Sequence, residues 1–179
     1  MDNGKLSVRY ARALLSTAEA QHCEKEVYEG LVRLTGHYGA AISQFNEILN
    51  NPVIGQEEKI RLLETAIGDP IHDCLRHFLH FVTEHKREDK IFLIALKYQE
   101  MYREEKNILR TDVTAAAELP ESSLNQIKDF VEQTFHCTAE LRVKVNPSLI
   151  GGFILDIENN RMDAILAGQL EALKQKLNE

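Results

Sequence analysis

The sequence is poor in the residues that mark special classes of protein. Tryptophan is absent, and cysteine occurs only three times, at Cys23, Cys74 and Cys137, with no CxxC pair. An odd number of widely separated cysteines favours reduced thiols in a cytoplasm-like compartment over a disulfide framework. No uninterrupted apolar run approaches the roughly 20 residues that a membrane-spanning helix needs. We therefore expect a chain whose core forms without disulfides and that works at a membrane, if at all, through partners.

Positive charge is also scarce. Lysine and arginine total 21 against 28 aspartates and glutamates, which gives the 179-residue chain a net charge of −7. This balance works against the electrostatic capture of a phosphate backbone, so nucleic acid is not expected as the main partner. The rest of the composition, 44% hydrophobic and 27% charged residues, is that of an ordinary globular protein.

The first part of the chain shows a helical period. Apolar residues recur every three or four positions in successive stripes, for example at Val27, Leu31 and Leu34. Asp69–Pro70 has the pattern of an N-cap followed by proline at the first helical position. About five or six helices joined by short loops fit into residues 1–105, which predicts a helical bundle.

The pattern changes in the second part. Apolar and polar residues alternate over 109–115 and 141–145, as they do in half-buried strands. Pro120 introduces a helix between these segments, and 153–157 predicts a further strand. Residues 106–179 therefore predict a small α+β domain with a short mixed or antiparallel sheet. The chain as a whole is expected to be mainly α.

Few residues suggest catalysis. The best metal candidate is the group Cys74, His77 and His80, because thiolate and imidazole are zinc ligands and a three-residue spacing puts the histidines on adjoining parts of one helical face. No second cluster completes a four-ligand site, and the pattern is more typical of a helix surface with packed imidazoles. Nucleotide-binding glycine motifs, a GxSxG elbow and HExxH are absent. We expect no catalytic residue, cofactor or metal, and a metal-dependent hydrolase is the less favoured alternative.

Two helices carry more apolar surface than one core contact needs. With about 100° of rotation per residue, the helix around Tyr10 has apolar residues on two separate arcs. On the helix that starts at Asp69, Phe81 lies roughly 60° outside the apolar stripe that includes Phe78. Either both faces are buried within the bundle, or the two helices border a groove that receives an amphipathic helix from a partner.

Four segments resemble one known family. They are RYARALL at Arg9–Leu15, NPVIGQEEK at Asn51–Lys59, the stretch Phe78–Arg87 and, most specifically, the ending NPSLIGGFILDIENNRMDAILAGQLEALKQKL at 146–177. In this order and spacing they are similar to the delta subunit of F-type ATP synthases, whose mitochondrial counterpart is the oligomycin-sensitivity-conferring protein. One departure is Ile165, where the family usually has serine. A hydroxyl there would support the start of the last helix, so the change affects local capping.

The resemblance implies a non-catalytic stator subunit. In the family, an N-terminal six-helix bundle binds N-terminal segments of alpha subunits on the catalytic alpha/beta head, and a C-terminal domain binds the C-terminus of the b-type peripheral stalk. The corresponding domains here are 1–105 and 106–179. In the family, this subunit keeps the catalytic head from turning with the rotor. Proton translocation is thereby coupled to ATP synthesis or hydrolysis. The resemblance implies a peripheral position on the cytoplasmic face of the bacterial inner membrane, within the ATP synthase complex.

The same resemblance indicates contact candidates. The alpha-subunit groove would be formed by residues of the first helix and of the helix that starts at Asp69, namely Tyr10, Ala13, Phe78 and Phe81. Stalk contacts would come from one strand and the closing leucine helix, namely Phe153, Leu166, Leu170, Leu173 and Leu177. A generic helical protein–protein adaptor is the alternative, which apolar periodicity alone does not distinguish.

Overall fold

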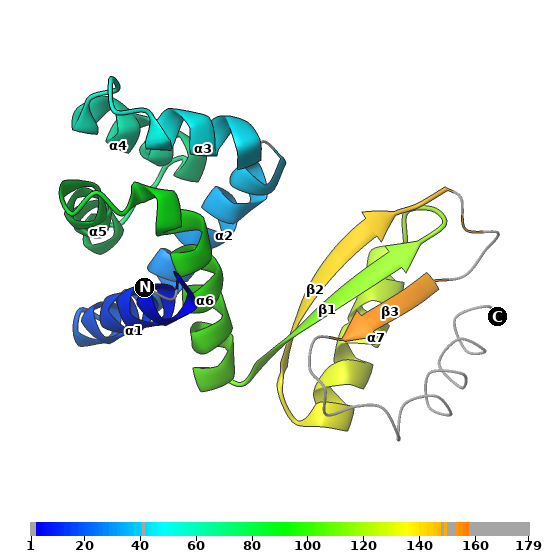
Figure 1. Ribbon diagram of the computed structural model, residues 1–179. Helices are drawn as coiled ribbons and strands as arrows, with labels where there is room; N and C mark the ends of the chain where they lie inside the picture. Colours follow the sequence, from blue (N-terminus) through cyan, green and yellow to red (C-terminus); the bar gives the residue numbers. More distant parts are fainter. Residues whose placement is uncertain (1–2, 41, 148, 150–152, 158–179) are drawn as a thin grey trace. The chain divides into compact units, whose positions relative to one another are not determined.

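The computed structural model describes residues 3–40, 42–147, 149 and 153–157 (Figure 1). The chain divides into two compact units, Met1–Glu105 and Lys106–Glu179. The described elements of the first unit are α1 (Asn3–Ala20), α2 (Glu24–Ala40), α3 (Ile42–Asn50), α4 (Gln56–Ile67), α5 (Asp73–Glu84), the 3₁₀ turn η1 (Glu88–Lys90) and α6 (Ile91–Glu105). Those of the second are β1 (Ile108–Ala115), α7 (Glu121–Phe135), β2 (Thr138–Val145) and β3 (Phe153–Ile157). A mainly helical fold with a small mixed sheet, as the sequence predicts, is confirmed.

Helix α6 is the central element of the first unit, because it packs against both α1 and α2 (Figure 1). Tyr98 of α6 is fully buried, and its hydroxyl donates a hydrogen bond to the carbonyl oxygen of Glu24 at 3.1 Å. The buried Gln99 amide donates to the carbonyl oxygen of Leu31 at 3.0 Å. Buried polar groups cost free energy unless they are hydrogen-bonded, so these bonds fix how α6 sits on α2.

A buried ion pair joins α4 to η1. Nζ of Lys59 lies 2.6 Å from Oε1 of Glu88, and both side chains are almost fully buried. Removing either partner would leave the other charge without compensation in a desolvated site. The pair therefore holds η1, the turn before α6, against α4.

The start of α5 differs from the prediction. The sequence indicates a cap at Asp69, but α5 begins at Asp73, and Nδ1 of His72 accepts a hydrogen bond from the backbone N–H of Cys74 at 3.2 Å. The physical reason lies on α2: the guanidinium of Arg33 donates to the carbonyl oxygen of Pro70 at 3.0 Å. That carbonyl is thereby held in the α4–α5 connection instead of accepting an intrahelical bond.

The second unit contains a three-stranded sheet among its described residues, in the order β2-β1-β3. β1 pairs with β2 in parallel and with β3 in the antiparallel sense, so the sheet is mixed. Helix α7 connects the parallel pair, as a crossover must, and packs on β2. Alternate residues of the strands form the core with α7, in clusters that include Val113, Ile127 and Phe153.

Candidate functional site

A groove of about 550 Å³ lies in the first unit, lined by residues of α1 and α5. Each helix contributes residues at positions i, i+3, i+4 and i+7, the spacing of one helical face. The lining is Arg9, Tyr10, Ala13, Leu14, Thr17, Cys74, His77, Phe78 and Phe81. The four residues that the sequence indicates for the groove, Tyr10, Ala13, Phe78 and Phe81, are thus brought together in one hollow.

The walls of the groove are exposed and its floor is buried. Phe81 is 46% exposed, which is unusual for a large aromatic residue, and its ring lies 6.0 Å from the ring of Tyr10 across the groove. The Leu14 and Cys74 side chains are only 3% and 4% exposed and close the bottom. Exposed apolar surface gathered in a concave site is typical of protein-binding surfaces.

The two apolar arcs of α1 have different roles. Ala11 and Ala18 are fully buried and Leu15 nearly so, on the side of the helix that faces the interior of the unit. Ala13 is exposed and Tyr10 half-buried, and both line the groove. One arc therefore packs into the core, while the other is left open on the surface of this unit.

Cys74 offers no nucleophile at the floor of the groove. Burial raises the pKa of its thiol to about 11, and the neighbouring Cys23 thiol adds to the rise. A thiol of this kind stays protonated near neutral pH, whereas nucleophiles and zinc ligands are thiolates. His77 and His80 are exposed, and the described part of the chain holds no group of three or more potential ligands that could bind a metal. The hydrolase alternative gains no support from this geometry.

The predicted stalk contacts fare differently. Phe153 is 6% exposed and packs with Val113, Ala115 and Ile127 in the core of the second unit. Its pairing opposite Ala115 puts it on the face of the sheet that these core residues share. Phe153 is therefore a core residue of the second unit and not the surface contact that the sequence predicted. The four leucines of the predicted closing helix, Leu166, Leu170, Leu173 and Leu177, lie outside the described residues.

Some residues that line the groove were not predicted as groove contacts from the sequence. Thr17 and His77 continue the i, i+3, i+4, i+7 spacing from Tyr10 and from Cys74, so each stripe extends to them. Arg9 is charged, so a search for apolar periodicity does not find it.

None of the helices in the described ranges is long and apolar enough to cross a membrane.

Comparison with known proteins gives consistent matches over nearly the whole chain. A family model described as ATP synthase delta (OSCP) subunit matches residues 6–177. An ATP synthase subunit delta from Parabacteroides distasonis is 35% identical over 179 residues, which cover 100% of this chain and 99% of the relative. One from Phocaeicola vulgatus is 34% identical over 174 residues, 97% of this chain and 94% of the relative.

The fold is also found among solved structures. A chain in the cryo-EM structure of the Toxoplasma gondii mitochondrial ATP synthase hexamer matches with a TM-score of 0.63 and 21% sequence identity. The match covers 97% of this chain and 98% of that chain. At this identity the likeness is one of fold.

Proposed function

Since the chain belongs to the ATP synthase delta (OSCP) subunit family, we propose that the groove between α1 and α5 receives an N-terminal segment of an alpha subunit. The chain is a non-catalytic stator subunit of an F-type ATP synthase. In this proposal α1–α6 form the six-helix bundle of the family, which attaches to the alpha/beta catalytic head. Family membership rules out an adaptor unconnected with ATP synthase.

The observation that carries the proposal is the exposed apolar lining of the groove. Phe81 is 46% exposed, and together with Phe78 of the same helix it faces Tyr10 across a hollow that has no charged residue on its α5 wall. The lining from Tyr10 to Thr17 covers two turns, or about 10 Å of helix axis. A short amphipathic helix fits such a site, because its apolar face would remove these side chains from water.

The second unit would hold the C-terminus of the b-type stalk. Family membership is the support for this part of the proposal, and the leucines of the closing helix that the sequence predicts, between Leu166 and Leu177, are the proposed contacts. The chain would then link head to stalk, on the cytoplasmic face of the bacterial inner membrane. A link of this kind resists the torque of the rotor and so couples proton translocation to ATP synthesis or hydrolysis.

A peptide-binding experiment tests the groove. The full chain is prepared as wild type and as the Ala13→Asp variant. Each is titrated with a peptide that carries the N-terminal segment of the alpha subunit from the same genome. We expect wild type to bind and Ala13→Asp to lose most of its affinity, because the docked apolar face would remove water from the new carboxylate. Ala13 is exposed in the free chain, so the variant should fold.

Ala20→Asp is the matched control, since it places the same charge at an exposed position at the end of the same helix, outside the groove lining. It should bind the peptide as wild type does. Equal affinity of Ala13→Asp and wild type would show that the alpha segment binds elsewhere.

A further inference from the structure

The α1 wall of the groove is bordered by a row of cations. Lys5, Arg9 and Arg12 follow one another at spacings of four and three residues, so they share one side of the helix, and all three are exposed. Arg9 lines the groove itself, and its guanidinium carbon lies 6.0 Å from the centre of the Tyr10 ring. Arg9 also lines a second hollow along α1, together with Lys5 and Arg12. The cations therefore begin at the rim of the apolar lining and continue away from it.

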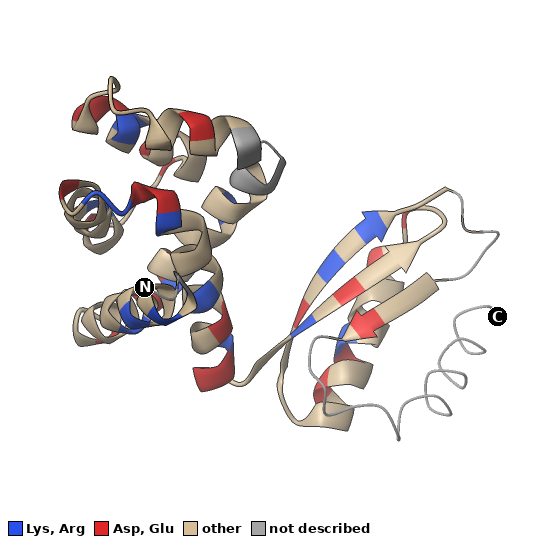
Figure 2. Cartoon of the chain, viewed as in Figure 1, with Lys and Arg blue, Asp and Glu red and all other residues tan. Residues whose placement is uncertain are grey.

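These cations are not used by the rest of the described structure. Within the described ranges, Lys5, Arg9 and Arg12 form no ion pair with a carboxylate. The helix has no acidic residue before Glu19, so three positive charges stand together in a chain of net charge −7 (Figure 2).

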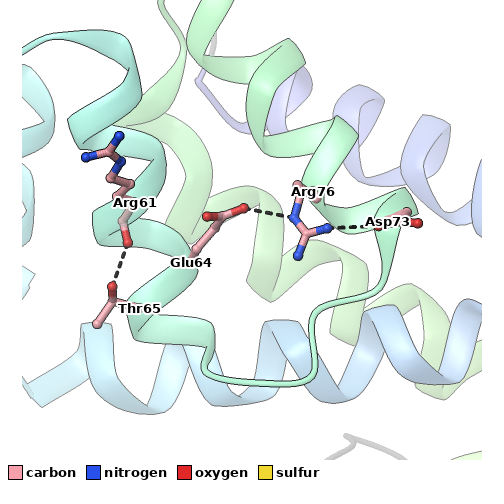
Figure 3. Close-up of polar contacts among 5 residues, drawn as sticks. All are labelled: Arg61, Glu64, Thr65, Asp73 and Arg76. Carbon is pink, nitrogen blue, oxygen red and sulfur yellow. Dashed lines mark hydrogen bonds and ion pairs between the residues drawn. The ribbon is translucent and has the colours of Figure 1, made fainter.

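The opposite wall differs in its charge. The one arginine of α5, Arg76, is 3.0 Å from Oε1 of Glu64 and 2.9 Å from Oδ1 of Asp73, so its charge is already compensated (Figure 3). The groove residues contributed by α5 are a cysteine, a histidine and two phenylalanines. The site is therefore asymmetric, with uncompensated positive charge beside α1 and none beside α5.

We propose that the groove selects an amphipathic helix that carries carboxylates along the edge facing α1. The inference rests on the proposed function, because it concerns the same groove, and it adds the charge and the orientation of the occupant. The apolar face of that helix fills the space among Tyr10, Phe78 and Phe81, and its acidic edge meets Arg9 first. Lys5 and Arg12 extend the positive field and attract the same edge during encounter.

The expected effect is moderate and depends on salt. An exposed ion pair changes affinity by about two- to fivefold, so two such pairs give a preference of about tenfold. The attraction between exposed charges falls when the screening length drops from about 10 Å at 0.1 M salt to about 3 Å at 1 M. The apolar contribution to binding does not fall in this way.

Three synthetic helical peptides test the inference with the full chain. They share one apolar face and differ along one edge, which carries glutamate, glutamine or lysine. At low salt we expect the glutamate peptide to bind about tenfold more tightly than the glutamine peptide, and the lysine peptide to bind most weakly. The preference should disappear at 1 M salt.

Charge-removing variants locate the effect. In the double variant Arg9→Gln/Arg12→Gln the glutamate and glutamine peptides should bind equally. Arg61→Gln is the matched control, because Arg61 is an exposed arginine on α4 whose side chain is not in the groove lining. It should keep the full preference for glutamate.

Several results would overturn the inference. Equal binding of the three peptides to wild type, or a preference that survives in the double variant, would show that the cations do not select the occupant. So would a complete lack of binding by all three peptides. If vesicles of phosphatidylcholine and phosphatidylglycerol bound wild type but not the double variant, while the peptides showed no preference, the cations would serve a lipid surface. In each case the alpha-segment titration with Ala13→Asp still decides separately whether the groove is the docking site.

Discussion

Phe81→Ala should weaken docking in the groove without unfolding the chain. Phe81 is 46% exposed, and a phenylalanine side chain buries about 200 Å² when it is fully enclosed, so a docked helix would cover about 90 Å² of it. At about 25 cal/mol per Å² this burial contributes about 2 kcal/mol. The alanine variant should therefore bind the alpha-subunit segment with a dissociation constant roughly 30-fold higher.

The cost to the free chain should be smaller than the cost to binding. In the free chain the Phe81 ring contacts Tyr10 at 6.0 Å and His85 at 4.3 Å between ring centres. Losing such partly exposed ring contacts costs about 0.5–1.5 kcal/mol of unfolding free energy. Calorimetric titration measures the binding change, and urea unfolding of the same preparation measures the change in stability.

Leu93→Ala is the control for Phe81→Ala. Leu93 lies on α6, is 41% exposed and is not part of the groove lining. Its truncation removes a similarly exposed apolar side chain and should leave the affinity for the segment unchanged. Equal losses of affinity in the two variants, or no loss in Phe81→Ala, would refute the assignment of the binding energy to the groove.

Three further predictions concern stability. Lys59→Met leaves the buried Glu88 carboxylate without its partner and should lower the unfolding free energy, measured in urea, by about 3–5 kcal/mol. The double variant Lys59→Met/Glu88→Leu should recover most of this loss. A small effect of the single change would show that the pair is not desolvated. Burial raises the pKa of Cys74 from 9.0 to about 11, so its protonated thiol stabilises the fold below pH 9 and this contribution should be lost as the pH rises from 9 to 11. Cys74→Ala should flatten the fall of unfolding free energy over that pH range. An unchanged pH profile would contradict the raised pKa of Cys74. A Cβ on Gly30 would lie 2.7 Å from a leucine methyl carbon, whereas one on Gly36 would meet nothing within 4 Å. In the same urea assay, Gly30→Ala should therefore destabilise the chain by about 1–3 kcal/mol, and Gly36→Ala should stabilise it by about 0.5–1 kcal/mol. The reverse order of stabilities would be inconsistent with the packing of α2.

Local patterns in the sequence predicted most of the fold, because those patterns have local causes. Alternation over 109–115 predicted β1, since a strand with one buried face must alternate. The start of α5 could not be found in this way. The connection before it is held by the bond from Arg33 to Pro70, which joins residues 37 positions apart and leaves no mark on local periodicity.

The candidate site shows the same division. Helical spacing showed that two helices carry apolar surface beyond one stripe, and the family resemblance indicated Tyr10, Ala13, Phe78 and Phe81 as groove contacts; these four line the groove. The spacing does not reveal which apolar strand residue is buried. Phe153 was expected at a surface but packs in the core, because the pairing of β3 with β1 decides which of its faces is covered.

Recovery of ATP synthase subunits from native membranes tests the central claim most directly. The full chain, tagged and expressed in its own organism, is isolated in mild detergent as wild type and as Ala13→Asp, and the subunits that accompany it are quantified. Wild type should bring down alpha, beta and b subunits, whereas Ala13→Asp should lose alpha and beta and retain b. Wild type without alpha and beta, or Ala13→Asp with undiminished alpha and beta, would contradict the claim.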